Sequence, residues 1–273
     1  MTITPDAITS SANPRVKAAV RLRERRERDL TGLTIVDGPR ELLRALDHGV
    51  EVVEAFVCDE LIRAADAMQA VKRLRTAGVG AIRVSPNVLT KVAFGDRTDG
   101  VIAIIRTPDT GLERLAPPLV PLIVVVESVE KPGNMGAIVR TADGAGADAV
   151  IAAHPLTDVF NPSAIRASLG TIFGLPIATA STSATLEWLA SKGIRPIATK
   201  VYALQFYTEV DLRGPVAIIL GSEAAGLSDA WDDAHADAVS IPMLGAADSL
   251  NVSAVAAVLL YEARRQRSSG TWA

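Results

Sequence analysis

The chain has 273 residues, a formal net charge of −3, and a composition that is 49% hydrophobic and 22% charged. These values exclude a disordered chain and leave room for two ordinary domains. Apolar runs of five to seven residues are too short to cross a bilayer, and residues 1–20 lack the apolar core of a signal peptide.

The few cysteines and histidines predict neither a disulfide nor a metal site. Cys58 is the single cysteine, which favours a cytoplasmic protein, and its strand-like surroundings indicate a small apolar filler rather than a nucleophile. His48, His154 and His235 are scattered without ligand spacing, so we expect no metal.

Charge is distributed unevenly between the two halves of the chain. Residues 1–107 carry 17 Lys and Arg against 14 Asp and Glu, whereas residues 108–273 carry 11 against 17. Such an asymmetry hints that the first half faces a polyanion.

Helix and strand patterns alternate through the first hundred residues. A helix is expected from Val16 into an arginine-rich stretch that includes Arg21 and Arg25. Strands are expected at 33–36, 52–57, 81–84 and 101–105, and further helices at 40–47, 60–77 and 87–93. This alternation predicts a small α/β domain over residues 1–106. Because Glu24 and Glu27 interrupt the arginines, this stretch is either a solvated helix face with internal ion pairs or a phosphate-contacting patch.

A linker over residues 107–120 is predicted from four prolines and a glycine within 107–121 and from the absence of any sustained period. Residues 121–273 then form the second domain. Its strands are expected at 122–126, 149–153, 175–179, 194–199, 216–220 and 239–241, and its helices at 134–145, 162–169, 185–191, 229–234 and 253–267. Apolar strands that alternate with helices predict a mostly parallel sheet covered on both faces.

Several common nucleotide and hydrolase motifs are excluded. Residues 144–149, GAGADA, match a dinucleotide fingerprint but follow a helix and precede a strand, which is the reverse of the required context. We interpret them as a helix end and a turn. The sequence contains neither a P-loop nor the G-x-S-x-G elbow of many serine hydrolases.

Three separated segments carry the polar and glycine residues of a candidate site. The first has Asn134, expected at a helix N-cap, followed by Gly136 and Arg140. The second, 220–228, reads LGSEAAGLS after an apolar strand, and the third, 241–253, reads IPMLGAADSLNVS before an apolar helix. Each alone could be an ordinary turn. Together they lie beyond the ends of parallel strands, where α/β sheets bind ligands.

In this order, the three segments closely resemble the signature motifs of the SpoU (TrmH-like) group of SPOUT RNA methyltransferases. Residues 166–176 also look like the family's middle segment, and residues 1–106 resemble the small L30e-like α/β substrate-binding domain often fused ahead of this fold. The family usually has Glu where this chain has Asp37.

The resemblance implies S-adenosylmethionine as methyl donor, a ribose 2′-hydroxyl of structured RNA as acceptor, and a trefoil knot in the second domain. Cofactor contacts are implied for a set of residues in the second and third segments: Gly221, Ser222, Ile241, Met243, Leu250 and Ser253. The implied catalytic group comprises Asn134, Arg140, Glu223, Ser249 and Asn251. By resemblance Arg140 removes the hydroxyl proton, but a guanidinium is a poor base, so we hypothesise that Arg140 binds a phosphate and stabilises alkoxide charge.

RNA contacts are expected from Arg166 and Ser168 and from Arg21 and Arg25 in the first domain. The family also implies a homodimer, and the apolar helix over 255–261 is the expected interface. Ribosomal RNA, 23S in particular, is the expected substrate and transfer RNA the alternative. A base methyltransferase, a non-catalytic RNA-binding protein on the same fold and, more distantly, a Rossmann oxidoreductase are the rival classes.

Overall fold

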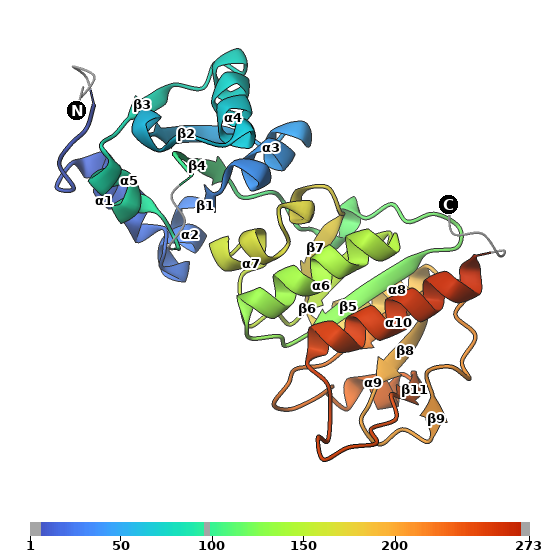
Figure 1. The fold of residues 1–273 in the computed structure, drawn as a ribbon. Helices are drawn as coiled ribbons and strands as arrows, with labels where there is room; N and C mark the ends of the chain where they lie inside the picture. The colour runs from blue at the N-terminus through green and yellow to red at the C-terminus, as the bar shows by residue number, and fades with distance from the viewer. Residues whose placement is uncertain (1–6, 96–98, 269–273) are drawn as a thin grey trace. The chain divides into compact units, whose positions relative to one another are not determined.

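The structure is a computed structural model that describes residues 7–95 and 99–268. The chain divides into two compact units (Figure 1). Unit 1 comprises Met1–Pro108 and Phe160–Gly174, and unit 2 comprises Asp109–Val159 and Leu175–Ala273. The junction at Pro108 lies within the predicted linker. Among the described residues, no helix has both the length and the apolar character needed to pass through a bilayer.

Unit 1 is built on a four-stranded sheet of order β1-β4-β2-β3, in which only β2 and β3 run parallel. The strands are β1 Leu33–Asp37, β2 Val52–Val57, β3 Ala81–Arg83 and β4 Val101–Arg106. The helices are α1 Pro14–Arg21, α2 Arg25–Thr31, α3 Pro39–Asp47, α4 Ala65–Thr76, α5 Pro86–Val92 and α7 Pro162–Ala167, with short 3₁₀ turns η1 Asp59–Leu61 and η3 Thr171–Phe173. On one face of the sheet α1 and α5 pack on Phe56 and Ile102.

Two predicted helix boundaries in unit 1 are wrong. The helix expected to run from Val16 through the arginines breaks after α1, because the buried Arg28 donates from Nη1 to the carbonyls of Leu22 and Arg23 at 2.7 and 2.8 Å. The helix expected from residue 60 begins at Ala65, because η1 and an extended Ile62 precede it.

Residues 160–174 pack within unit 1, although the sequence pattern assigns them to the second domain. The buried hydroxyl of Thr34 donates to the carbonyl of Phe160 at 2.8 Å, and Arg44 Nη1 donates to the carbonyl of Leu169 at 2.7 Å. Gly170 lies so close to the α3 backbone at Glu41 that a Cβ would sit 2.9 Å from Cα. These contacts attach the segment directly to β1 and α3.

Unit 2 contains a seven-stranded sheet of order β7-β6-β5-β10-β8-β11-β9, and every neighbouring pair in it is parallel. The strands are β5 Leu122–Glu127, β6 Ala149–Ala153, β7 Ile177–Ala180, β8 Arg195–Thr199, β9 Gln205–Phe206, β10 Val216–Leu220 and β11 Asp237–Ser240. The helices are α6 Pro132–Ala145, α8 Thr182–Ser191, α9 Ala230–Asp233 and α10 Val252–Arg267, with a 3₁₀ turn η2 Leu112–Arg114. The parallel α/β sheet predicted from the sequence is confirmed.

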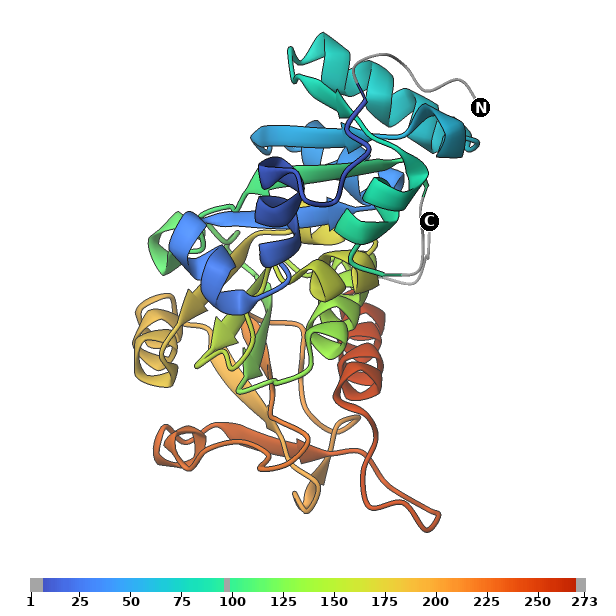
Figure 2. The same cartoon turned by 90° about the vertical axis from the view of Figure 1, so that its left-hand side faces the viewer.

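Helices cover both faces of this sheet, as Figures 1 and 2 show. α6 and α10 lie side by side on one face, and α8 covers the other. The unbroken apolar strands follow from this double burial, since Ile123 and Val125 contact the α8 side while all of β5 is buried.

The strand order reverses between β5 and β10. From β5 the chain adds β6 and β7 on one side, and β8 to β11 lie on the other side. Because β5 and β10 are parallel neighbours, the segments after Glu127 and after Leu220 leave the sheet at one edge. Ligands bind at such a switch point in open α/β sheets.

Further differences from the sequence expectation concern unit 2. α8 begins at Thr182 rather than at residue 185, with the hydroxyl of Ser181 capping it by accepting from the N–H of Ala184 at 3.1 Å. α6 begins at Pro132 with Lys131 at its N-cap, so Asn134 lies in the first turn rather than at the cap. The ring of Pro132 presets the backbone for the first helical position. The short strand β9 was not predicted, because two exposed residues give no periodic pattern. The interpretation of 144–149 as a helix end is confirmed, since Gly146 caps α6 with φ 70°.

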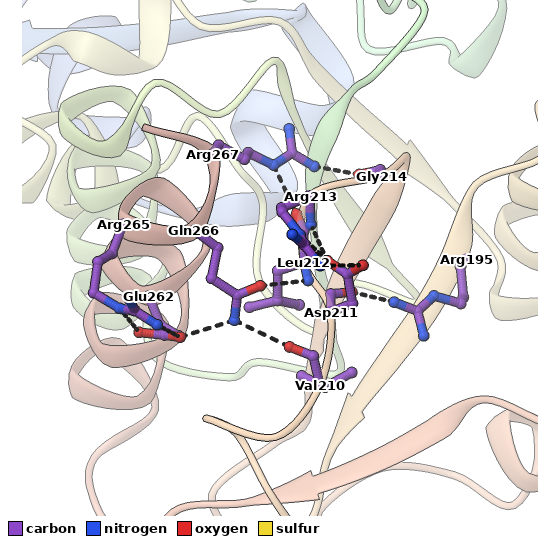
Figure 3. A network of polar contacts seen from close by, with 10 residues as sticks. All are labelled: Arg195, Val210, Asp211, Leu212, Arg213, Gly214, Glu262, Arg265, Gln266 and Arg267. Carbon is purple, nitrogen blue, oxygen red and sulfur yellow. Dashed lines mark hydrogen bonds and ion pairs between the residues drawn. The ribbon is translucent and has the colours of Figure 1, made fainter. Parts of the chain in front are cut away.

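The last turns of α10 bind the segment that leads into β10 (Figure 3). Gln266 accepts from the N–H of Leu212 at 2.8 Å and donates to the carbonyl of Val210 at 3.0 Å. Arg267 donates to the carbonyls of Leu212 and Gly214 at 2.8 and 2.5 Å. This contact fixes one end of α10, whose other end reaches the candidate site.

Candidate active site

Gly221 lets the loop after β10 fold back on itself. A Cβ at Gly221 would overlap the backbone of Gly226, which itself has φ +69°. Ser222 and Gly226 exchange two backbone hydrogen bonds of 3.0 Å, and the Ser222 hydroxyl accepts from the N–H of Ala225 at 3.0 Å. The glycines of this segment are therefore required by a tight turn that a larger residue would open.

Glu127, at the end of β5, holds the far end of the same loop. Its buried carboxylate accepts from the N–H and hydroxyl of Ser228 at 2.8 and 2.9 Å and from the hydroxyl of Thr182 at 2.6 Å. Burial opposes ionisation, but these hydrogen bonds outweigh it and hold the pKa of Glu127 below its ordinary value. The sequence analysis did not single out Glu127, since it ended the strand at residue 126 and assigned Glu127 to the polar loop that follows.

A cavity of about 1100 Å³ opens between the loop after β10 and the chain after β11. Five of the six predicted cofactor residues line it: Gly221, Ser222, Ile241, Met243 and Leu250. Ser253 is not among the lining residues and instead donates its hydroxyl to Asn251 at 2.6 Å. The structure thus brings the two loops together around one space, as the sequence analysis expects.

The third wall of the cavity comes from residues 199–205, which the sequence analysis missed. They join β8 to β9 and include Tyr202 and Leu204, both largely exposed. Apolar residues such as Tyr202 and Leu204 in a turn are the feature of the sequence that could have drawn attention to this segment. With Val239, Val255 and Leu259 they make the walls largely apolar, and residues 221–227 line the same cavity.

These walls fit an adenosyl cofactor. A flat heterocycle suits an apolar slot with a few fixed donors and acceptors, and ligand cavities have volumes of about 300–1,000 Å³. The close approach at Gly221 leaves backbone rather than side chain at that edge of the space.

A polar cluster lies beside the cavity and joins three elements. Glu223 Oε1 accepts from Nδ2 of Asn134 at 2.9 Å and from Nδ2 of Asn251 at 2.7 Å. Asn251 also caps α10, since its Oδ1 accepts from the N–H of Ser253 at 3.0 Å. Asn134, Glu223, Asn251 and Ser253 are thus brought together from α6, the loop after β10 and the start of α10.

Lys131 belongs to this cluster and was not predicted. Its Nζ donates to Glu223 Oε2 at 2.6 Å, and this hydrogen bond holds the pKa of Glu223 below its ordinary value. A second cavity of about 230 Å³ is lined by Glu130, Lys131, Asn134 and Glu223, among others. The sequence analysis placed residues 127–133 in a loop. A helix predicted to begin at Pro132 would have placed Lys131 at its N-cap.

The remaining two predicted catalytic residues lie outside the cluster. Arg140 is exposed near the middle of α6, and within residues 7–95 and 99–268 no hydrogen bond or ion pair holds its guanidinium. Ser249 lines the large cavity. The structure therefore leaves Arg140 available to an external partner.

The four predicted RNA-contacting residues have different surroundings in unit 1. Arg21 and Arg25 are exposed and pair with Glu27 and Asp29 at 3.3 and 3.5 Å. Such surface pairs agree with a solvated helix face and leave the patch open to other anions.

Ser168 is completely buried, whereas the RNA contact predicted for it needs an exposed hydroxyl. Its hydroxyl donates to the carbonyl of Ile165 at 2.8 Å and accepts from the N–H of Gly170 at 3.2 Å. It therefore shapes the turn after α7 instead of offering a hydroxyl to a ligand. Arg166 keeps part of its side chain exposed, with Nη1 at 3.9 Å from Asp37 Oδ2.

Comparisons with known proteins match both parts of the chain. A family model described as SpoU rRNA Methylase family matches residues 121–261, and one described as MRM3-like substrate binding domain matches residues 13–103. The chain is 31% identical over 258 residues to a 23S rRNA (uridine(2479)-2'-O)-methyltransferase of Streptomyces viridochromogenes, covering 91% of this chain and 88% of that protein.

Solved structures also resemble this chain along nearly its whole length. A crystal structure of an RNA 2'-O ribose methyltransferase matches with a TM-score of 0.84 and 43% identity, covering 96% of this chain and 99% of that one. An AdoMet-bound rRNA methyltransferase from Sinorhizobium meliloti matches with a TM-score of 0.87 and 30% identity, covering 96% and 98%.

Proposed function

Because the chain belongs to the SpoU rRNA Methylase family, we propose that it methylates a ribose 2′-hydroxyl of 23S ribosomal RNA with S-adenosylmethionine as donor. The resemblance inferred from the three sequence segments and the α/β fold class are confirmed. The observation that supports this function most is the meeting of Asn134, Glu223 and Asn251 beside the cavity at the switch point. The relative named for 23S rRNA favours ribosomal RNA over transfer RNA.

Bound S-adenosylmethionine would supply a methyl group for in-line transfer. The ribose oxygen would bond to the methyl carbon as the carbon–sulfur bond breaks, the sulfonium would leave as a neutral thioether, and the hydroxyl proton would pass to water. We assign its adenosyl group to the cavity wall formed by Gly221, Ile241 and Leu250, with Ser222 and Met243 beside them. Ser253 is assigned to positioning, because its hydroxyl bonds to Asn251. Since in-line displacement depends on alignment, walls that fix the donor should supply much of the rate.

Glu223, Asn134 and Asn251 form the hydrogen-bonding set that orients the acceptor nucleotide, and Ser249 faces it from the cavity wall. Arg140 binds the neighbouring phosphate and stabilises the charge that develops on the 2′-oxygen. A guanidinium stays protonated in nearly all protein environments, so its fixed fork of donors suits this task better than proton removal.

We assign recognition of the RNA to the domain over residues 1–106, with Arg21 and Arg25 as contacts, and to Arg166 of the segment 160–174, which packs within the same unit. Recognition of folded RNA by shape and phosphates suits the positive balance of that domain. We further propose a trefoil knot in the domain over 121–273, a homodimer that uses the exposed side of α10 near Tyr261, and a cytoplasmic location. Ala256, Leu259 and Leu260 of the helix are buried within its own unit and leave only its outer side for a partner.

The test is a methylation assay with 23S rRNA transcripts and tritium-labelled donor, followed by digestion to nucleosides. We expect the label in one 2′-O-methyl nucleoside and none with Arg140→Ala. Label in a methylated base would establish the base-methylating alternative. Donor binding with no transfer to 23S or transfer RNA would support a non-catalytic RNA-binding protein, and transfer to transfer RNA alone would change the substrate.

A further inference from the structure

Lys131 is the one charged side chain of the cluster that the proposed function leaves without a role. It occupies the N-cap of α6 but makes no side-chain cap. Its ammonium instead donates to Oε2 of Glu223 at 2.6 Å. Glu223 lies 92 positions later in the chain, in the loop after β10. The Lys131 side chain is 71% exposed and that of Glu223 is 32% exposed.

The two oxygens of Glu223 have separate tasks. Oε2 is held by Lys131, and Oε1 receives the amide hydrogens of Asn134 and Asn251. A hydrogen bond at one oxygen favours one orientation of the carboxylate, in which the other oxygen is aimed at the two amides. When the NH2 group of an amide side chain donates to an acceptor of fixed position, the orientation of the amide oxygen is fixed as well.

We propose that Lys131 is a positioning residue of the active site, which holds Glu223 ionised and oriented so that Asn134 and Asn251 present fixed hydrogen-bonding groups to the acceptor nucleotide. This role deepens the proposed function and rests on it. It joins the first turn of α6 to the loop after β10 and, through Asn251, to the start of α10.

The charges around Glu223 support this role. Lys131 faces it from α6, the amides of Asn134 and Asn251 face it from α6 and α10, and Glu130 lies beside Lys131 at the same small cavity. The hydrogen bond to Glu223 raises the pKa of Lys131, and the attraction of Glu130 adds to this shift. The Lys131 ammonium and the Glu223 carboxylate therefore each favour the charged form of the other.

The first test needs neither RNA nor donor. Carboxyl carbon NMR of the full chain, followed through a pH titration, reports the pKa of Glu223. Lys131→Met should raise this pKa towards that of an ordinary glutamate, while Lys131→Arg should preserve the lowered value. Lys192→Met, which removes an exposed lysine from α8's end, is the matched control and should change nothing. An unchanged Glu223 titration in Lys131→Met would overturn the proposal.

The second test separates positioning from binding. We expect Lys131→Met to lower kcat by at least about threefold, the size of an exposed charged pair, with an unchanged Kd for S-adenosylmethionine. Lys131→Arg should restore most of the rate. Equal loss in both variants, or a loss confined to donor affinity, would contradict a positioning role. If the unaltered protein methylates no RNA, the proposed function fails, whatever the NMR titration shows.

Discussion

Arg140 differs from Asn134, Glu223 and Asn251 of the predicted catalytic group because its guanidinium lies outside the polar cluster. It is exposed on α6, whereas Asn134 of the same helix is bonded to Glu223. A base that removes the ribose proton must release its own proton readily, which a guanidinium does not do. The planar fork of donors instead matches two phosphate oxygens at once.

We therefore predict that Arg140→Lys lowers kcat by roughly tenfold or more, because an ammonium cannot bind a phosphate through two parallel hydrogen bonds. Single-turnover methylation of 23S rRNA measures the rate, and calorimetric titration with S-adenosylmethionine should give an unchanged Kd. Near-full turnover of the lysine variant would mean that a single positive charge suffices and that the fork is unimportant.

Asp37 is a buried carboxyl in unit 1 whose ionisation carries a cost. Its Oδ2 accepts from the N–H groups of Phe94 and Gly95 at 2.9 and 3.2 Å. Burial raises the pKa of Asp37 despite these hydrogen bonds and the nearby Arg166. A group with a raised folded pKa adds stability below its unfolded pKa and loses it as the pH rises through the folded value.

Replacing Asp37 by Asn keeps an acceptor for both N–H groups and removes the charge. The unfolding free energy of Asp37→Asn, relative to the parent, should therefore increase as the pH rises from about 4 to 7, since an unfolded aspartate titrates near 3.9. Asp37→Ala should cost about 1–3 kcal/mol, because two buried donors lose their acceptor. Urea denaturation at several pH values tests both. An Asn variant that loses stability as the pH rises would show that the ion pair with Arg166 dominates.

At the scale of elements, the apolar strands could be predicted because burial on both faces leaves an unbroken hydrophobic run. β5 and β10 are examples, and the loops that follow them were correctly expected at one edge of the sheet. Boundaries set by a single side-chain contact could not be predicted, such as the break after α1, where Arg28 donates to the carbonyl of Leu22. The packing of residues 160–174 in unit 1 likewise depends on Thr34 and Arg44, more than a hundred positions away.

The C-terminal end of α10 gives a prediction at this scale (Figure 3). Arg267 donates to four carbonyls, those of Val120, Pro121, Leu212 and Gly214. Figure 3 draws the last two of these acceptors. Arg267→Met should lower the unfolding free energy by about 1–3 kcal/mol, because these carbonyls lose a charged donor. Arg264→Met removes an exposed arginine from the same helix and should cost less than about 0.5 kcal/mol. Equal losses in urea denaturation would show that the four hydrogen bonds do not stabilise the fold.

At the scale of the molecule, the candidate site depends on segments that are distant in the chain. Asn134, Glu223 and Asn251 could be singled out from the sequence because their residue types and spacing match a family. Lys131, Glu127 and the 199–205 wall could not be assigned to the site, since a helix N-cap, a strand end or an apolar turn indicates local structure and not which distant residues it will face. Only the parallel pairing of β5, β10, β8 and β11 places these residues around one space.

The most direct measurement is a calorimetric double-mutant cycle for S-adenosylmethionine with Gly221→Ala in the loop after β10 and Leu250→Ala in the segment before α10. We predict that each change weakens binding and that their effects are not additive, because both residues line one pocket. Leu30→Ala, an exposed leucine of unit 1, should bind like the parent. No binding by the parent, or a loss from only one of the two changes, would contradict a donor pocket shared by the two loops.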